Sequence, residues 1–112
     1  MNTFILTGTT RGLGKSLSKA LSINDYAKDK KVFISRQLHD FTVDPLIDYL
    51  SMDLSEEIID FSPINLTEKT KWVIFINNAS VIEPIAKALD ISLKDVDAPI
   101  NVNFKTPFRL AQ

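Results

Sequence analysis

The sequence predicts an α/β protein built on a doubly wound parallel sheet. Strand-like and helix-like segments alternate along the chain, and this order favours parallel strands joined by right-handed crossovers. The most apolar run, residues 72–76, is typical of a strand covered on both faces. All three glycines lie within seven residues, at the junction between the first strand and the first helix.

Short apolar or β-branched runs predict four strands, at residues 3–7, 32–34, 46–52 and 72–76. The first run stops at Gly8, and the third ends just before Asp53. Between the second and third strands the sequence is polar and irregular, so we expect a loop there.

Three segments are predicted to be helical, at residues 12–23, 54–64 and 92–112. In the first, apolar residues recur with the spacing of one helix face, at positions 13, 17, 20 and 21. The second would begin near Ser55 and is limited by Pro63. The third opens on Ser92 and Asp95, which are spaced as a capping box with Asp in place of Glu.

Composition excludes several classes of function. The net charge is −1 with both signs interspersed, so no basic surface is available for nucleic acid. Cysteine is absent, and the single histidine, His39, argues against a histidine metal cluster or a Ser-His-Asp site. No metal site is therefore expected. Because no apolar run approaches the roughly 20 residues that span a bilayer, we expect a soluble, cytoplasmic protein without a membrane partner.

Two phosphate-binding patterns compete for residues 8–16. A triphosphate loop needs a glycine five positions before Gly14, but Thr9 stands there. The most apolar strand is followed by Asn77 rather than by the aspartate that would hold magnesium. A P-loop NTPase is therefore the less favoured interpretation.

The spacing that is present, Thr-Gly-x3-Gly-x-Gly, suits a dinucleotide. Gly8 allows a tight turn, Gly12 lets the backbone approach phosphates, and Gly14 lets the helix pack close to the sheet. A plain turn is the alternative. However, a chain of this length carries about eight glycines at average usage, and concentrating its only three here favours a Rossmann-type site.

These residues resemble the short-chain dehydrogenase/reductase family, whose classical members show TGxxxGxG after the first strand and NNAG after the fourth. Here residues 7–14 read TGTTRGLG and residues 77–80 read NNAS. Asp53-Leu54 and Val102-Asn103 are two further matches. The resemblance implies the strand order 3-2-1-4, covers only the N-terminal part of a family member, and is closest to sepiapterin and benzil reductases.

The resemblance implies a nicotinamide cofactor, and the charges predict NADP(H) rather than NAD(H). NAD-specific sites place an acidic residue after the second strand, whereas this sequence has Ser35 and Arg36 there. Arg11 adds a second cation inside the glycine loop. Solvated surface arginines are the alternative, but a planar guanidinium suits a 2′-phosphate.

Further cofactor contacts follow from the resemblance alone. Asp53 is expected to accept a hydrogen bond from the adenine amino group, with Leu54 contributing its backbone. Asn78 and Ala79 are expected on the ribose side, next to Ser80, which stands where the family has glycine. Leu13, between the last two glycines, is counted among the cofactor-binding residues.

The family's catalytic group is Asn-Ser-Tyr-Lys, and Asn103 matches its asparagine, which holds a proton-relay water. Pro107 lies four residues later and has no N–H for the Asn103 carbonyl. Helix distortion alone is the alternative reading of this proline. Tyr26 and Lys30 have the family's Tyr-x3-Lys spacing, but they lie before the second strand, so we do not expect them to be the catalytic pair.

The resemblance therefore predicts that the serine, tyrosine and lysine lie beyond Gln112. Residues 1–112 would form an NADP(H)-binding domain that is incomplete at its C-terminus and inactive alone. An intact chain would reduce a small carbonyl substrate, and only such a chain is expected to form homo-oligomers. A non-catalytic nucleotide-binding module is the alternative function.

Overall fold

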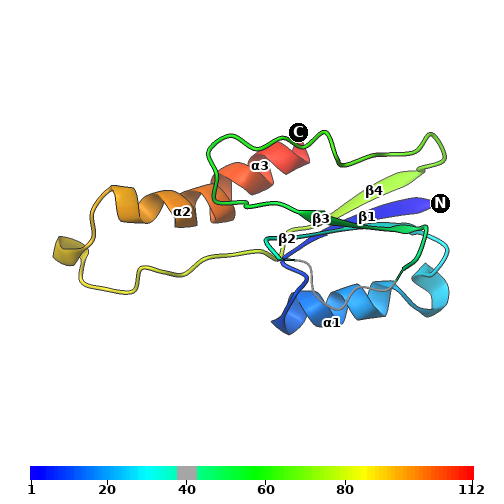
Figure 1. Ribbon diagram of the computed structural model, residues 1–112, viewed down its shortest axis with the longest axis horizontal. Helices are drawn as coiled ribbons and strands as arrows, with labels where there is room; N and C mark the ends of the chain where they lie inside the picture. The colour runs from blue at the N-terminus through cyan, green and yellow to red at the C-terminus, as the bar shows by residue number, and fades with distance from the viewer. Residues whose placement is uncertain (38–42) are drawn as a thin grey trace.

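The computed structural model describes residues 1–37 and 43–112 (Figure 1). Residues 38–42, which include His39, lie outside the described residues. Four parallel strands form one sheet in the order β3-β2-β1-β4, as the sequence predicts. The strands are β1 (Asn2–Thr7), β2 (Lys30–Ser35), β3 (Ile47–Ser51) and β4 (Trp72–Ile76).

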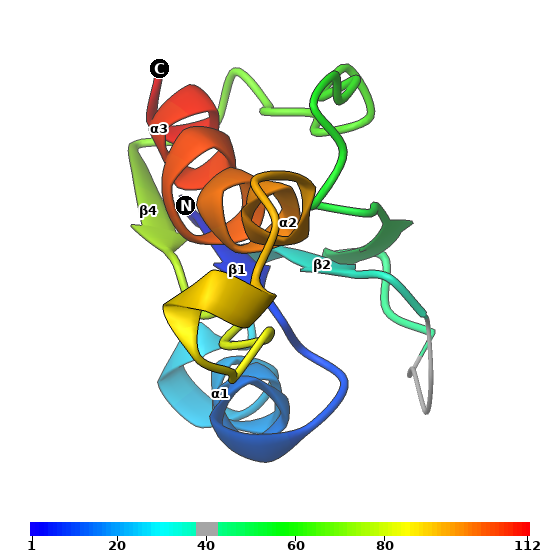
Figure 2. The same ribbon diagram turned by 90° about the vertical axis from the view of Figure 1, so that its left-hand side faces the viewer.

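Helical segments lie on both faces of this sheet, which makes it doubly wound (Figures 1 and 2). Helix α1 (Gly12–Leu21) covers one face. The segment between β3 and β4 lies over the other face, together with a continuous helical stretch near the end of the chain. That stretch comprises α2 (Asp97–Ile100), the π-helical turn η4 (Asn101–Lys105) and α3 (Thr106–Ala111).

Each face has its own apolar core, because successive strand residues point to opposite sides. Under α1 the buried residues are Phe4, Leu6, Leu21, Phe33 and Ile47. Under the other layer they are Ile5, Val32, Ile34, Met52, Leu54 and Val102. The two cores hold the sheet rigid between the helical layers and so fix the positions of its strand ends.

Strand β2 begins two residues before the predicted strand at 32–34, and its first two residues are buried lysines. Lys30 pairs with Asp48 at 3.2 Å. The Lys31 ammonium group donates to the carbonyls of Tyr26 and Ala27 at 3.0 and 3.3 Å, and burial lowers its pKa. Tyr26 ends the short helix η1 (Asn24–Tyr26). Because lysines interrupt an apolar pattern, the sequence pattern did not predict this part of the strand.

The helix predicted at residues 54–64 is wrong, since turns and bends occupy this segment. Asp53 and Asp60 accept hydrogen bonds from backbone amides two residues later, a local geometry that competes with helix. Side chains from the last helical stretch also take the carbonyls of Leu54 and Ser55. A helix would need those carbonyls for its own hydrogen bonds.

The apolar face predicted for the first helix is only half right. Leu21 is buried and Leu17 packs against the same core. Leu13 is 67% exposed, and Ala20 is also exposed. The first turn of α1 stands at the end of the sheet, beyond the strands that would cover an apolar side chain.

The last helical prediction is confirmed, including its capping box. The Ser92 backbone amide donates to the Asp95 carboxylate at 3.0 Å, and the Asp95 amide donates to the Ser92 hydroxyl at 3.2 Å. The short helices η2 (Ala88–Asp90) and η3 (Lys94–Val96) precede α2.

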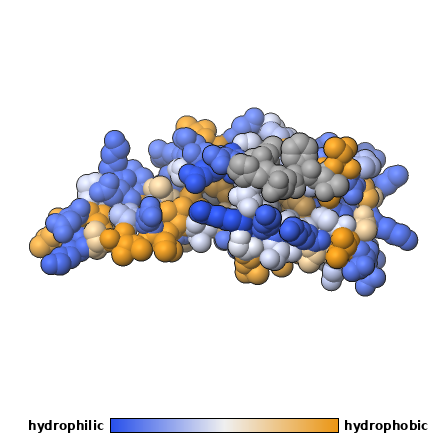
Figure 3. Space-filling model, turned by 60° about the horizontal axis from the view of Figure 1, so that its bottom comes forward, coloured by the Kyte–Doolittle hydropathy of each residue, from blue (hydrophilic) through white to orange (hydrophobic). Residues whose placement is uncertain are grey.

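The segment between β4 and α2 extends away from the sheet and carries apolar surface (Figures 1 and 3). Its exposed apolar residues are Ile82, Ile85, Leu89 and Leu93. None of the helices in the described part of the chain has the length and hydropathy of a membrane span.

Among the described residues, strand β4 pairs only with β1 and forms one edge of the sheet. Trp72 and Val73 on this strand are exposed. The expectation that residues 72–76 are covered on both faces is wrong, since none of them is buried and β4 lies at the edge of the sheet. Such an edge provides unpaired backbone groups for a further strand.

Replacing Leu6 with alanine should lower the free energy of unfolding by about 3 kcal/mol, because Leu6 is fully buried. Leu13→Ala is the matched control. It removes the same atoms from an exposed position and should change stability by less than about 0.5 kcal/mol. Chemical denaturation measures both, and equal losses would contradict this assignment of the core.

Candidate functional site

The predicted site residues gather where the four strands end. Because parallel strands point the same way, their carboxyl ends share one edge of the sheet. Gly8 follows β1 and Arg36 follows β2, while Asp53 lies two residues after β3 and Asn78 two residues after β4. Residues from four separated parts of the sequence thus meet at one edge.

The glycine turn after β1 depends on backbone conformations that favour glycine. Gly8 and Gly12 have φ values of +73° and +58°. The Gly8 amide donates to the Ile34 carbonyl at 2.8 Å, which ties the turn to β2. A Cβ on Gly14 would collide with the Gly8 carbonyl oxygen, so the start of α1 packs directly against the end of β1.

The amino-terminal end of α1 is suited to an anion. Its N-cap residue, Arg11, makes no side-chain capping bond, and the first turn holds no acidic residue. The first amides of a helix have no intrahelical acceptor and carry partial positive charge. A Cβ on Gly12 would meet no atom within 4 Å, so the space beside these amides is open.

The turn after β4 is fastened to the glycine turn. The buried Thr7 hydroxyl accepts hydrogen bonds from the amides of Asn78 and Ala79, at 3.1 and 3.0 Å. The Asn78 side chain donates to the Gly8 carbonyl at 3.1 Å. These bonds give Asn78 a structural role in addition to its predicted place beside the cofactor. Ser80 follows this turn and is exposed.

Ser35 and Arg36 differ in what their side chains offer. The buried Ser35 hydroxyl donates to the Gln37 carbonyl at 2.6 Å. The Arg36 carbonyl accepts a bond from the Ser51 hydroxyl at 2.7 Å, which fixes its backbone, while its side chain is exposed. Arg36 therefore presents an anchored cation at this edge.

Asp53 is held as a carboxylate. Its Oδ1 atom accepts hydrogen bonds from the Ser55 amide at 3.0 Å and from the Ser55 hydroxyl at 2.6 Å. The hydroxyl bond is the main cause of an Asp53 pKa below the ordinary 3.8, and the positive charge of Arg36 lowers it further. Leu54 is buried, and its carbonyl accepts a bond from Thr106 at 2.8 Å.

Asn103 faces the segment after β4. Its Oδ1 accepts from the Val81 amide at 2.8 Å, and its Nδ2 donates to the Val81 carbonyl at 2.7 Å. The side-chain amide thereby makes a reciprocal pair with one backbone unit. Pro107, four residues later, has no N–H to donate to the Asn103 main-chain carbonyl.

Solved structures with the same arrangement exist. A short-chain dehydrogenase/reductase from Burkholderia vietnamiensis matches with a TM-score of 0.83 and 24% identity, covering 97% of this chain and 53% of its own. A short-chain dehydrogenase family protein from Francisella tularensis subsp. tularensis SCHU S4 matches with a TM-score of 0.72 and 17% identity, over 99% and 44% of the two chains.

The bulky-bulky ketone specific alcohol dehydrogenase from Comamonas testosteroni matches with a TM-score of 0.71 and 21% identity, over 99% of this chain and 47% of its own. No protein-family model matches the sequence, and neither does any curated protein. This is the fold of the amino-terminal part of a short-chain dehydrogenase/reductase. The chain spans about half the length of the three solved structures.

Tyr26 and Lys30 lie at the edge of the sheet opposite the glycine turn. Tyr26 precedes β2 and packs edge-on against Phe4, with the ring centroids 5.6 Å apart. Lys30 is the first residue of β2 and pairs with Asp48. Both therefore lie at the amino ends of the strands, opposite the glycine turn.

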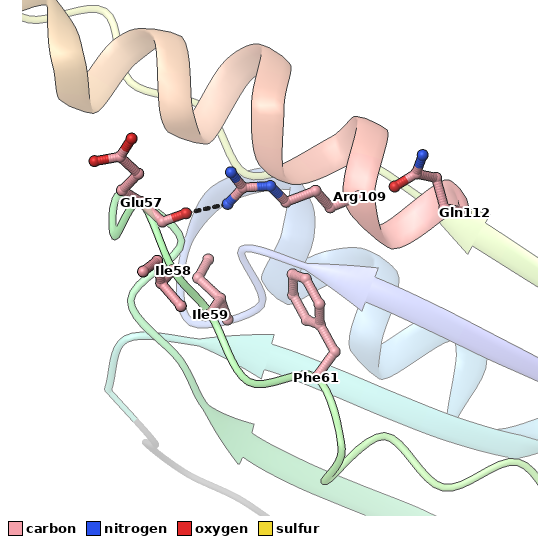
Figure 4. A pocket seen from close by; sticks show the side chains of 6 residues that line it. All are labelled: Glu57, Ile58, Ile59, Phe61, Arg109 and Gln112. Carbon is pink, nitrogen blue, oxygen red and sulfur yellow. Dashed lines mark hydrogen bonds between the residues drawn. The ribbon is translucent and has the colours of Figure 1, made fainter.

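A shallow hollow lies between α3 and the segment after β3 (Figure 4). It is lined by Glu57, Ile58, Ile59, Phe61, Arg109 and Gln112. The Arg109 guanidinium donates to the Glu57 carbonyl across one side of it. None of these residues is among the predicted cofactor contacts.

Sequence reasoning missed the residues that support the site rather than line it. The Asn101 and Thr106 side chains bond carbonyls that are distant in the sequence. Ser55 bonds Asp53 within a local turn. No local signal marked Asn101 and Thr106, which with Val102 are the buried residues of a helical stretch that is otherwise partly or fully exposed.

Gly14→Ala should destabilise the fold more than Gly12→Ala. Alanine at 14 would clash with the Gly8 backbone, whereas at 12 it meets no atom within 4 Å and bears only the strain of its positive φ, about 1 kcal/mol. Thermal denaturation of both variants checks the order. The reverse order would contradict the close packing of α1 on β1.

Ser55→Ala should raise the Asp53 pKa toward its ordinary value, because Ser55 donates the principal hydrogen bond to the carboxylate. A depressed carboxyl pKa stabilises the folded chain above the unfolded pKa, and this contribution is lost as the pH falls through the folded pKa. The variant should therefore lose less stability between pH 5 and pH 2, a range of about three units around that pKa.

An NMR titration of the Asp53 carboxyl carbon measures this shift directly. Asp60 is a reference carboxyl, since its pKa is lowered by hydrogen bonds from Ser62 rather than Ser55. An Asp53 midpoint that does not move in Ser55→Ala, or an Asp60 midpoint that moves equally, would be evidence against this hydrogen bond.

Proposed function

We propose that this chain is the NADP(H)-binding part of a short-chain dehydrogenase/reductase that transfers hydride from NADPH to a carbonyl substrate. The observation that carries the proposal is the glycine turn. Its two positive-φ glycines and the close approach of Gly14 leave helix amides beside open space at the sheet edge. A diphosphate fits such a cradle because its oxygens accept bonds from backbone amides.

The charges around the turn support a dinucleotide whose ribose carries a 2′-phosphate. Arg36 is anchored through its backbone and exposed through its side chain, and Arg11 is exposed at the start of α1. No acidic residue stands at the end of β2 to bind a free 2′-hydroxyl. NADP(H) is therefore proposed in preference to NAD(H).

The adenine and ribose contacts are assigned by position. Asp53 would accept from the adenine amino group with its second oxygen, because Ser55 already holds Oδ1. Leu54 would contribute backbone beside the base. Asn78 and Ala79 would line the ribose, with Ser80 at the exposed end of that turn.

The bound cofactor would supply the hydride for carbonyl reduction. Within residues 1–112, Asn103 is the proposed contributor to proton transfer, through a water held on its main-chain carbonyl. Tyr26 and Lys30 are not proposed for this step, because they lie at the opposite edge of the sheet from the glycine turn.

The carbonyl substrate follows from the chemistry of the fold's oxidoreductases, and one of the matching structures is described as specific for ketones. A non-catalytic nucleotide-binding module would share the same cradle and the same charges. NADPH binding combined with a carbonyl-reduction assay of the full coding frame distinguishes the two. Binding without turnover in that frame would favour the module, and turnover would favour the reductase.

Arg36→Asp should weaken NADPH binding by on the order of tenfold or more while changing NADH binding little, because it removes a charge-assisted contact to the 2′-phosphate. Lys87→Asp is a matched control that makes the same charge change at an exposed position in the segment after β4. It should leave both affinities unchanged.

Isothermal titration calorimetry with the two reduced cofactors measures these affinities. Equal losses for NADPH and NADH in Arg36→Asp would reject the proposed preference for NADP(H). No binding of either cofactor to the unmodified protein would reject the proposed function itself.

A further inference from the structure

Three side chains of the last helical stretch hold the segment that follows β3. The Thr106 hydroxyl donates to the Leu54 carbonyl at 2.8 Å, and the Asn101 amide donates to the Ser55 carbonyl at 2.8 Å. Arg109 donates to the Glu57 carbonyl, one turn further along the helix. The helix thus replaces the local hydrogen bonds that a helical segment at this position would have made for itself.

The Thr106 contact is buried, and the Asn101 contact is partly buried. Thr106 is 1% exposed and Asn101 is 8% exposed. Breaking either bond would leave a buried side-chain polar group unsatisfied, which is costly. The carbonyls that they hold belong to the two residues directly after Asp53, and Ser55 is also the residue that binds the Asp53 carboxylate.

The π-helical turn η4 lets Asn101 and Thr106 both bond the segment after β3. In a regular α-helix, residues five apart in sequence are rotated by about 140° around the axis, so Asn101 and Thr106 would face different neighbours. Here the Thr106 amide donates to the Asn101 carbonyl, the five-residue step of a π turn. That step brings Thr106 above Asn101, and both reach adjacent carbonyls of one segment.

The same turn carries Asn103, which holds the backbone of Val81 after β4. One helical turn therefore fastens two segments that leave the carboxyl edge of the sheet. Asn103 faces the segment after β4, and Asn101 and Thr106 face the segment after β3. A widened turn of this kind is common at functional sites.

We propose that Asn101 and Thr106 are positioning residues for the adenine end of the cofactor. By holding the Leu54 and Ser55 carbonyls they fix the backbone after β3, and through Ser55 they aim the Asp53 carboxylate at the adenine amino group. This inference rests on the proposed function, because it assumes that Asp53 contacts the base. It assigns a binding role to two residues that would contact no cofactor atom.

The test compares affinities for NADPH and for its hypoxanthine analogue, which lacks the adenine amino group. A hydrogen bond from that group to a carboxylate should make the unmodified full-length protein prefer NADPH by about tenfold. Thr106→Val and Asn101→Leu each remove one of the two hydrogen bonds to the segment after β3 with little change in volume. Each should reduce the preference for NADPH to threefold or less. Thr106→Ser keeps the hydroxyl and should retain the preference.

Thr3→Val is the matched control. Thr3 lies on β1, away from the segment after β3, and is fully buried. The variant removes its hydroxyl, which makes a hydrogen bond with the Thr70 hydroxyl at 2.8 Å. It should lower stability while leaving the preference at its original value. Because both ligands bind only the folded protein, the ratio of their affinities is insensitive to the fraction that is folded, and a destabilised variant still gives an answer.

An unchanged preference in both Thr106→Val and Asn101→Leu would overturn the positioning role, and so would an equal loss in Thr3→Val. An unmodified protein that binds both ligands equally would also overturn it, while leaving the proposed NADP(H) function standing. An unmodified protein that binds neither ligand would instead refute the proposed function.

Discussion

The structure depends on the close approach of three backbone segments at the end of β1. Gly14 at the start of α1 lies against the Gly8 carbonyl, with no room for a Cβ between them. The Thr7 hydroxyl and the Asn78 side chain bind the turn after β4 to the same place. This contact places the first amides of α1 and the turn after β4 side by side at the carboxyl edge of the sheet.

Hydrogen bonds from side chains hold the loops of this edge in place. Each loop is fastened by a side chain from a different element: the turn after β4 by Thr7, the segment after β3 by Asn101 and Thr106, and the backbone of Arg36 by Ser51. Groups that would bind a ligand therefore stand on segments whose backbone is already held by these hydrogen bonds, so less ordering is left for the moment of binding.

The electrostatics of the edge follow from the same arrangement. The Arg36 guanidinium lies near enough to Asp53 to lower its pKa, so a cation and a carboxylate occupy neighbouring strand ends. A cation at the end of β2 suits a phosphate, and a carboxylate at the end of β3 suits an amino group. In the proposed function, the cation would bind the 2′-phosphate and the carboxylate would bind the adenine amino group.

The sequence by itself determined the four parallel strands and the glycine turn, because apolar runs and glycine spacing are local signals tied to backbone geometry. The strand order followed from the family resemblance of the motifs. The sequence also predicted the capping box at Ser92. Only the tertiary structure decided that residues 54–64 form no helix, that Lys30 and Lys31 extend β2 into the core, and that Leu13 is exposed. These outcomes depend on hydrogen-bond partners and covering layers far away in the chain, and no local pattern records them.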